Sequence, residues 1–289
     1  MPERLLFAAV AAISGALLVS CAAEGARERA AAGAVAGTRA AKAESVSVDG
    51  VEQLRVMVLE VLPHDPRAFT QGLEVAGGTL YESTGLAGRS SVRAGPIGRR
   101  PTRQKALPAP LFGEGITVVG RKLWQLTWRN RIAIERDART LSEVRRVPYP
   151  DEGWGVCHQR SSNRLVTSDG SSRLTYRDPR TLARRGDVNV TQGGRPVTKL
   201  NELECVGEAV YANVLFTDRI VRIDSATGAV TASIDASGLL RKDERVHGSV
   251  LNGIAAVPGT DQFLVTGKLW PKTFRVVFVA AGRTGDSKG

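Results

Sequence analysis

A pattern that recurs along the chain constrains its fold more than any other feature of the sequence. Each copy begins with a polar or aromatic residue, which is usually followed by a glycine. A short apolar segment, a turn and a second short segment complete the copy. Self-similarity at spacings of 40 to 51 residues is typical of folds that repeat one supersecondary unit. The copies begin at Gln71, Glu114, Trp154, Asn201 and Asn252.

A second signal runs in phase with the first. The segments "RDARTL", "RDPRTL" and "IDSATG", around Asp137, Asp178 and Asp224, each follow a short alternating apolar segment. Asp followed three residues on by Thr is turn chemistry between paired strands, because these short side chains bond the local backbone. Long helical periodicity is absent from the sequence. The pattern predicts an all-β fold, a five-bladed β-propeller. A pair of β-sandwiches would not explain the in-phase repetition.

The repeats predict where a binding site would form. In a propeller the innermost strand of each blade lines a central channel, so equivalent residues fall around one mouth. We expect the residues that begin the copies to form a ring there. Amides, a carboxylate and an indole are costly to bury without partners, which favours a binding site over a water-filled plug. A second layer is expected at Glu82, Trp128, Asp169, Asn213 and Lys268.

The N-terminal residues predict export. Residues 1–21 combine Arg4, an apolar run and the sequence "LVSC", which ends at Cys21. The run has the length of a signal-peptide core and is short for a membrane span. Because "LVSC" resembles the bacterial lipobox, we expect lipidation of Cys21 and a membrane anchor. The alternative is an ordinary signal peptide with an incidental cysteine. We therefore expect a protein at the cell surface or in the periplasm, or else secreted.

The rest of the chain divides into three parts. Residues 22–50 hold no large apolar residue except valine and predict a flexible, alanine-rich tether. Residues 51–280 form the expected propeller domain, and residues 281–289 form a polar tail. The net charge of +11 is spread over single arginines, with one loose cluster at 98–105. Aromatic residues, at 5%, are too sparse for base stacking along a groove, so we expect no nucleic-acid partner.

Cysteine and histidine are few in the predicted domain. An oxidising compartment would permit a disulfide between Cys157 and Cys205, and two buried thiols are the alternative. His64, His158 and His247 lie far apart in the sequence and form no visible zinc-type cluster. We expect no metal site.

A series of motifs in a fixed order identifies a family resemblance. These motifs are "HDPRAFTQGLE", "YESTGLAGRSSVR", "FGEGIT", "LWQLTW", "GWG", "SDGSSRL", "LNELE", "YANV", "LNGIA" and "TGKLWP". Over about residues 56–275 the chain resembles the plant and bacterial type of glutaminyl-peptide cyclotransferase. The resemblance implies a five-bladed propeller that converts the N-terminal glutamine of peptides or proteins into pyroglutamate and releases ammonia. It implies no cofactor.

The resemblance also implies roles for the residues that match the family's motifs. Glu114 matches the catalytic carboxylate, and Asn201 and Lys268 match its polar partners. Attack of the substrate's α-amine on its own γ-carboxamide needs positioning, a proton shuttle and donors to an oxyanion. Glu114 would be the shuttle, with Asn201 and Lys268 as donors or as contacts to the amide or the peptide backbone. The implied pocket residues are Phe69, Gln71, Phe112, Trp128 and Trp154.

Plainer interpretations of the same residues remain open. Glu114 could cap backbone amides in a turn, Lys268 could form a buried ion pair with Glu82 or Glu202, and Gln71 could satisfy neighbouring backbone. A propeller that binds peptide termini or small ligands without turnover is the alternative function. A metal-dependent lactonase would need several carboxylates on the channel axis, whereas the expected mouth holds one among amides.

The chain departs from the family's pattern at two places. Leu215 follows "YANV" where the family usually has a tryptophan, which removes an aromatic wall from the expected pocket. The segment from Ala94 to Pro108 lacks an alternating apolar strand and an Asp-x-x-Thr turn. We therefore expect an irregular or disordered edge in the first blade.

Overall fold

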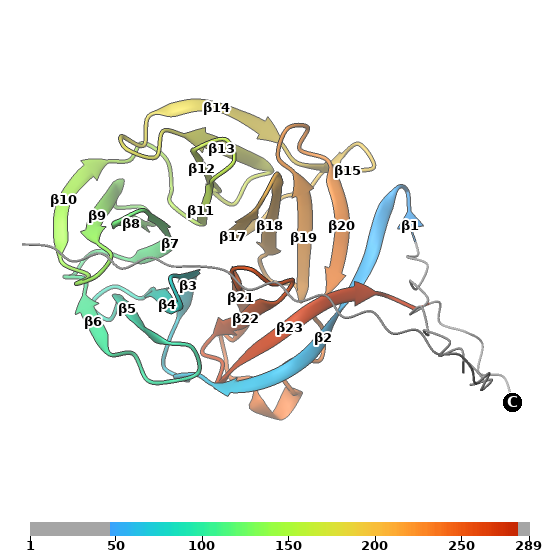
Figure 1. Ribbon diagram of the computed structural model, residues 1–289, viewed down its shortest axis with the longest axis horizontal. Coiled ribbons are helices and arrows are strands. Elements are labelled where there is room, and N and C mark those ends of the chain that lie inside the picture. The colour runs from blue at the N-terminus through green and yellow to red at the C-terminus, as the bar shows by residue number, and fades with distance from the viewer. Residues whose placement is uncertain (1–46, 283–289) are drawn as a thin grey trace, which may run out of the picture. The chain divides into compact units, whose positions relative to one another are not determined.

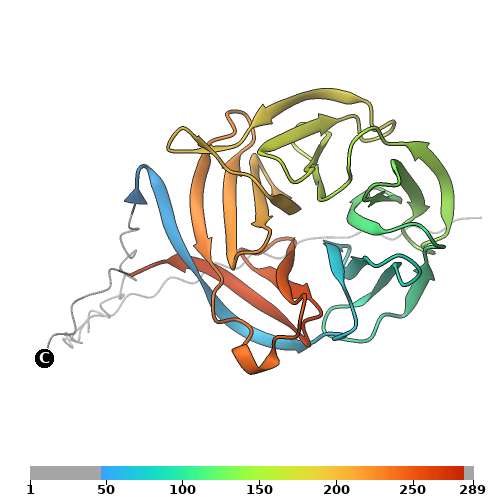
Figure 2. The same ribbon diagram turned by 180° about the vertical axis from the view of Figure 1, so that it is seen from behind.

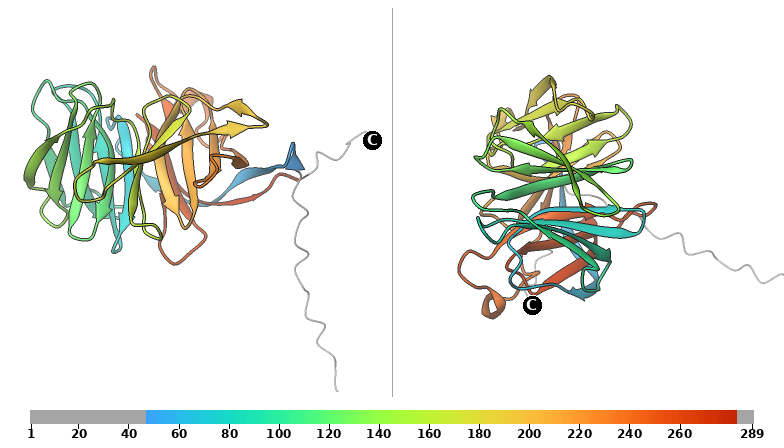
Figure 3. Two further views of the ribbon diagram at one scale, coloured as in Figure 1. Left: turned by 90° about the horizontal axis from the view of Figure 1, so that it is seen from above. Right: turned by 90° about the vertical axis from the view of Figure 1, so that its left-hand side faces the viewer.

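The computed structural model describes residues 47–282. The predicted signal peptide, Cys21, most of the tether and residues 283–289 of the tail lie outside this range. The described chain is all-β and propeller-like, with sheets arranged around a common centre (Figure 1), and the same ring is seen from behind in Figure 2. Seen from above, most strands run roughly along the viewing axis of Figure 1 (Figure 3). No helix within residues 47–282 has the length and apolar content needed to cross a membrane.

Three separate sheets of four antiparallel strands follow one another along the chain. Strands that are consecutive in sequence are neighbours in each sheet, as short hairpin connections favour. The first sheet contains β3 (Thr70–Ala76), β4 (Thr79–Thr84), β5 (Ser91–Pro96) and β6 (Arg103–Ala106). The second contains β7 (Gly113–Val119), β8 (Lys122–Thr127), β9 (Ile132–Asp137) and β10 (Glu143–Pro148). The third contains β11 (Val156–Gln159), β12 (Arg164–Thr167), β13 (Arg173–Arg177) and β14 (Arg184–Asn189).

A larger sheet joins the first and last parts of the described chain. Its order is β17-β18-β19-β20-β2-β23-β22-β21, and its N-terminal strand β2 lies between two antiparallel runs. β2 is parallel to β20 over Glu52–Arg55 and antiparallel to β23 over Leu54–Pro63, so the first long strand lies beside the last (Figure 1). The members are β2 (Val51–Pro63), β17 (Leu200–Val206), β18 (Ala209–Val214), β19 (Arg219–Asp224), β20 (Val230–Asp235), β21 (Val250–Ala256), β22 (Phe263–Lys268) and β23 (Lys272–Ala280). The short elements are β1 (Ser47–Val48), which pairs with β2, the hairpin β15 (Thr191–Gln192) and β16 (Arg195–Pro196), and the 3-10 helix η1 (Lys242–Glu244).

The inner strands β3, β7, β11, β17 and β21 close a ring. They contact one another in this order, and β21 contacts β3. Glycine allows this close approach, because a Cβ at Gly115 would lie 2.5 Å from the carbonyl oxygen of Trp154. A Cβ at Gly155 would lie 2.2 Å from the carbonyl oxygen of Asn201. The centre of the ring is therefore packed backbone against backbone.

Four inner strands carry a β-bulge where a copy of the sequence pattern begins. A bulge adds one residue to one strand of a pair, bends the strand and re-aims its side chains. The residues expected just before the inner strands therefore lie within them, with the exception of Trp154, which precedes β11. The bulges fall at Gln71 in β3, Glu114–Gly115 in β7, Asn201–Glu202 in β17 and Asn252–Gly253 in β21.

The predicted Asp-x-x-Thr turns are confirmed. At Asp137, Asp178 and Asp224, Oδ1 accepts hydrogen bonds from the backbone N–H and the hydroxyl of the threonine three residues on. These turns join β9 to β10, β13 to β14 and β19 to β20. Each is the third connection within its run of four strands, which explains why the signal recurs in phase with the repeat.

The segment from Ala94 to Pro108 is not the irregular edge expected from its sequence. It contains the end of β5 and all of β6, which pair antiparallel from Ser91 with Ala106 to Ala94 with Arg103. β6 is the outermost strand of its sheet and most of its residues are exposed. An outer strand held by backbone hydrogen bonds with few buried side chains does not need alternating apolar residues, so its sequence carried no strand signal.

Cys157 on β11 and Cys205 on β17 form a disulfide, which decides between the two alternatives left open by the sequence. Their Cα atoms are 5.4 Å apart and the residues are separated by 48 positions. A crosslink between neighbouring inner strands stabilises mainly by restricting the unfolded chain, typically by about 2 to 4 kcal/mol.

Three carboxylates of the inner strands lie in little-hydrated surroundings: Glu74 and Glu202 are buried, and Glu204 is half-buried. Glu202 accepts hydrogen bonds from the N–H of Leu73 at 2.9 Å and of Ile254 at 3.2 Å, so it ties β17 to β3 and β21. Burial raises the pKa of Glu74 to about 7. Burial together with neighbouring carboxylates raises the pKa of Glu202 and of Glu204 well above the usual range. These acidic groups thus favour their uncharged forms.

We expect Glu74→Gln to weaken the pH dependence of stability near neutrality. The folded-state pKa of Glu74 is raised, so stability that is present below about pH 4.5 is lost as the pH rises toward about 7. Glutamine stays uncharged and can still accept the Thr117 hydroxyl, which donates to Glu74 at 3.0 Å. Thermal unfolding between pH 5 and 8 should show a smaller fall in Tm for the variant than for the wild type. Glu60→Gln, at an exposed carboxylate, is the control, and an unchanged slope in Glu74→Gln would contradict the assignment.

Candidate active site

Glu114 is the centre of a buried polar cluster. It lies at the bulge of β7 and is 4% exposed. Its Oε1 accepts a hydrogen bond from Gln71 Nε2 at 2.7 Å, and Gln71 Oε1 accepts one from Asn252 Nδ2 at 3.2 Å. Burial raises the pKa of Glu114 well above its usual range, the charge of Glu152 adds to this effect, and the charge of Lys268 and the Gln71 bond oppose it. Residues from three of the bulges therefore meet, as the ring model predicts.

Lys268 supplies the cationic group of the cluster. It ends β22, is 6% exposed, and its Nζ lies 4.8 Å from the centroid of the Phe69 ring. Burial lowers the pKa of Lys268 to about 8, against the effect of the Glu114 carboxylate. Within residues 47–282 it forms no salt bridge with Glu82 or Glu202. Because burial favours the uncharged form of both Lys268 and Glu114, proton transfer at this site is feasible near neutral pH.

Amide side chains at the bulges serve the backbone and leave polar atoms free. Asn252 Nδ2 also donates to the carbonyl oxygen of Thr70 at 3.0 Å, and Asn213 Oδ1 accepts from the N–H of Gly253 at 3.1 Å. Within the described chain, three buried atoms of these amides have no hydrogen-bond partner: Asn201 Oδ1, Asn213 Nδ2 and Asn252 Oδ1. Buried polar groups are normally paired, so these atoms are suited to binding a polar ligand.

Half-buried aromatic side chains enclose the cluster. Phe69 and Phe112 meet edge to face with ring centroids 6.2 Å apart, and Phe112 and Trp128 lie 5.5 Å apart. Trp154 stands before β11 and is also half-buried. Partial exposure distinguishes these rings from core residues and fits the wall of an open site.

Glu152 orients two of these aromatic rings, Trp128 and Trp154. It was not identified from the sequence. Its Oε2 accepts hydrogen bonds from Nε1 of Trp128 at 3.0 Å and of Trp154 at 3.4 Å. Its Oε1 accepts from Arg129 Nε at 3.0 Å, and the guanidinium of Arg129 lies 4.2 Å over the Trp128 ring. The only signal was its position two residues before Trp154 in "DEGWG". Contact with Trp128 depends on the folded loop.

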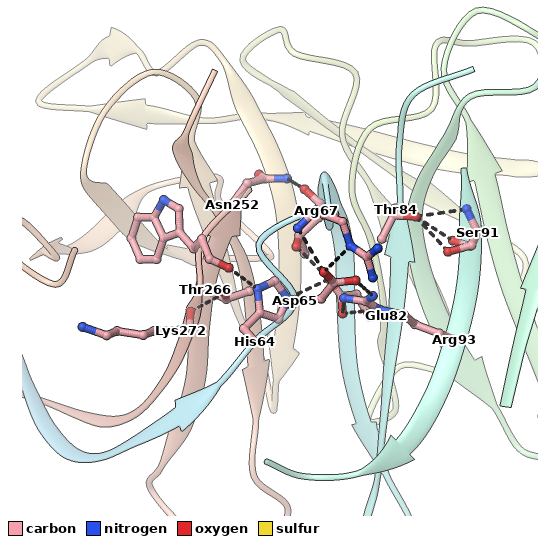
Figure 4. Close-up of polar contacts among 12 residues, drawn as sticks. His64, Asp65, Arg67, Glu82, Thr84, Ser91, Arg93, Asn252, Thr266 and Lys272 are labelled. Atoms are coloured by element: carbon pink, nitrogen blue, oxygen red, sulfur yellow. Dashed lines mark hydrogen bonds and ion pairs between the residues drawn. The ribbon is translucent and has the colours of Figure 1, made fainter. Parts of the chain in front are cut away.

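Glu82 does not join the site, contrary to expectation. It accepts from Thr70 Oγ1 at 2.7 Å and Arg93 Nε at 2.8 Å, and its Oε1 lies 3.0 Å from His64 Nε2 (Figure 4). Burial opposes its ionisation, but the charges of His64 and Arg93 lower the pKa of Glu82 to about 2. Asp169, also expected in the second layer, instead pairs with Arg173 at 2.8 Å.

The network of hydrogen bonds around Glu82 and His64 connects the chain segments that carry Phe69 and Lys268. His64 Nδ1 lies 2.6 Å from the carbonyl oxygen of Trp270, and Leu269 donates its N–H to the carbonyl oxygen of Ala68 at 2.7 Å. These bonds join the residues that precede Phe69 to those that follow Lys268. A cavity of about 620 Å³ beside the network has Glu82 and Arg93 in its wall, but no residue of the Glu114 cluster. Within residues 47–282, no three His, Cys, Asp or Glu side chains are arranged to hold a metal ion.

We expect Glu152→Ala to release both Trp128 and Trp154. The chain has four tryptophans, and the other two, Trp124 and Trp270, are fully buried away from Glu152. In ¹⁵N NMR spectra, two of the four indole N–H signals should move, because each loses its acceptor, while two stay in place. Glu143→Ala, at an exposed carboxylate on β10 that bonds Arg146, is the control and should leave all four signals in place. Movement of all four signals, or of none, would refute the contact of Glu152 with both indoles.

Comparisons with known proteins cover nearly the whole described chain. The family model for glutamine cyclotransferase matches residues 30–278. The glutaminyl-peptide cyclotransferase of Arabidopsis thaliana is 40% identical over 229 residues, which are 76% of this chain and 70% of that protein. The crystal structure of Myxococcus xanthus glutaminyl cyclase matches with a TM-score of 0.72 and 35% identity, over 79% of this chain and 98% of the other.

Proposed function

The chain belongs to the glutamine cyclotransferase family, and on this premise we propose that it cyclises the N-terminal glutamine of peptides or proteins to pyroglutamate with release of ammonia. One observation carries the assignment of the site. The carboxylate of Glu114 lies buried among amides, near the ammonium of Lys268 and inside an aromatic wall. No feature of residues 47–282 favours the non-catalytic alternative.

The reaction is an acyl transfer within one molecule. The substrate's α-amine nitrogen attacks the δ-carbon of its own side chain, and the bond from that carbon to the amide nitrogen then breaks. The amine loses a proton and the leaving nitrogen gains one, so a single group can act first as base and then as acid. Glu114 performs this transfer, since its raised pKa makes it a better base and a competent acid near neutral pH. Positioning by the pocket supplies a further part of the rate.

Lys268 and Asn201 act on the reacting amide. The Lys268 ammonium is suited to stabilising the oxyanion that forms when the amine attacks, because its charge is buried. Asn201 is 1% exposed and its Oδ1 has no partner among the described residues, so it can accept a hydrogen bond from the substrate's amide. Phe69, Phe112, Trp128 and Trp154 enclose the methylene groups, and Gln71 holds Glu114 in place.

We interpret the sheets as five blades, with the nine-stranded sheet contributing two of them, one completed by β2. The ring of contacts among β3, β7, β11, β17 and β21 supports this count.

We propose that residues 1–21 direct export, that Cys21 carries the anchor and that the active domain works outside the cytoplasm. The Cys157–Cys205 disulfide supports an oxidising compartment.

We expect Glu114→Gln to abolish most of the activity. An uncharged amide of the same size can keep a bond to Gln71 but cannot shuttle a proton, so the rate should fall about 100- to 10,000-fold. Mass spectrometry of a glutamine-leading peptide detects the loss of ammonia directly. Glu143→Gln, on the exposed start of β10, is the control, and a chelator arm tests metal dependence. Wild-type turnover by Glu114→Gln would refute the role of Glu114.

The alkaline limb of the pH profile should report Lys268. Its pKa is lowered to about 8, so the ammonium is present below that pH and is lost above it. We therefore expect kcat/KM to fall above about pH 8. Lys268→Arg should move this fall to higher pH, because a guanidinium keeps its charge throughout the range. An alkaline limb that stays in place in a folded Lys268→Arg variant would assign it to another group.

A further inference from the structure

Phe216 is an exposed aromatic residue with an unusual backbone conformation. It lies between β18 and β19, the residue is 70% exposed, and its φ is +66°. Two bonds fix the turn, because the N–H and the hydroxyl of Thr217 both donate to the carbonyl oxygen of Val214, at 3.1 and 2.6 Å. A positive φ is uncommon for a bulky residue, but it recurs in the equivalent connections of this fold, at Leu86, Arg131 and Leu269, so it belongs to the turn. The fold thus holds a large apolar ring out into solvent.

A continuous path of contacts links Phe216 to the wall of the active site. The neighbouring Leu215 donates its N–H to the carbonyl oxygen of Lys199 at 2.9 Å, and Lys199 donates its own N–H to the carbonyl oxygen of Gly170 at 2.8 Å. Gly170 lies directly against the indole of Trp154, since a Cβ there would be 2.7 Å from the ring. The segment that carries Phe216 is therefore linked to Trp154 through the backbone of Lys199 and Gly170.

Lys199 lies beside Phe216. Its Nζ lies 5.6 Å from the centroid of the Phe216 ring, within the range of a cation–π contact. Lys199 also has a positive φ, +64°, and is exposed. Lys199 lies two residues before Asn201 in the chain. Phe216 and Lys199 are therefore close in the fold to the side chain that we propose as an acceptor for the substrate's amide.

We propose that Phe216, with Lys199 beside it, forms a binding subsite for the residue that follows the N-terminal glutamine, and that this subsite favours an apolar or aromatic side chain. The inference rests on the proposed function and specifies its substrates. Phe216 follows the end of β18, which pairs with the start of β17, and Glu114 lies at the start of the inner strand β7, so Phe216 and Glu114 belong to the same end of the ring. We infer that a peptide whose N-terminal glutamine reaches Glu114 leaves the site at this end. A side chain at the second position can then cover the exposed face of Phe216, and contacts of this kind discriminate by burying apolar surface.

The selectivity between two peptides tests the subsite. Kinetics are measured with Gln-Phe-Ala amide and Gln-Gly-Ala amide for the wild type, Phe216→Ser, Phe216→Tyr and the control Val144→Ser. Val144 is also a large exposed apolar residue, 60% exposed, but it lies on the outer strand β10. We expect the ratio of the two kcat/KM values, Phe over Gly, to fall about three- to tenfold in Phe216→Ser, mainly through KM. Phe216→Tyr and Val144→Ser should keep the wild-type ratio.

Other outcomes overturn the inference in recognisable ways. An equal loss on both peptides would mean that Phe216 only supports the turn. An unchanged ratio in Phe216→Ser would remove it from the substrate path and leave its exposed ring as a contact for another protein. Both results would leave the proposed function intact. Failure of the folded wild type to release ammonia from either peptide would instead refute the proposed function itself.

Discussion

Backbone groups at the bulges of the inner strands must find partners at the buried centre of the ring, and the rest of the structure depends on how they do so. Unpaired N–H and C=O groups are costly to bury. The Glu202 carboxylate accepts hydrogen bonds from two backbone N–H groups, and the Asn213 amide oxygen accepts one. The Asn252 amide donates a hydrogen bond to a backbone carbonyl oxygen. These side chains hold neighbouring strands together. Asn252 also donates to Gln71, which in turn donates to Glu114, so a residue that closes the fold also helps to build the site.

The electrostatics of the site follow from this arrangement. The bulges place Glu114 where little solvent reaches it, and the pKa of its carboxyl rises because the charged form loses hydration. Lys268, buried nearby, is affected in the opposite direction. Burial disfavours the charged forms of both the Glu114 carboxyl group and the Lys268 amino group, so both groups are suited to exchanging protons with a substrate. Glu152 lies in the aromatic wall, where it orients two indoles and adds to the shift of Glu114.

The repeats made much of the fold and part of the site predictable. Gln71, Glu114 and Asn252 meet because they occupy equivalent positions in successive repeats, and equivalence can be read from spacing alone. The second layer was less predictable. Lys268 pairs with the first residue of β21, whereas Glu82 pairs with Leu73, further along β3, and so faces a different group of residues.

Contacts that depend on loops or on distant strands carried no sequence signal. The bond from Trp128 to Glu152 spans 24 residues and needs the folded connections on both sides. The pairing of β6 rests on backbone hydrogen bonds, which leave little trace in residue type. The position of β2 between β20 and β23 is set by ring closure and by no local pattern.

That position of β2 has a consequence for how the protein comes into being. The ribosome makes β2 first among the long strands and β23 last, yet the two are antiparallel partners over most of their length. Pairing of this sequence separation is slow, because the chain between must be ordered first. Until β23 arrives, the apolar side chains of Met57, Val58 and Val61 belong to a strand without its main partner. Such strands associate readily with other chains, so the nascent protein is most prone to aggregation during the interval before β23 has been made.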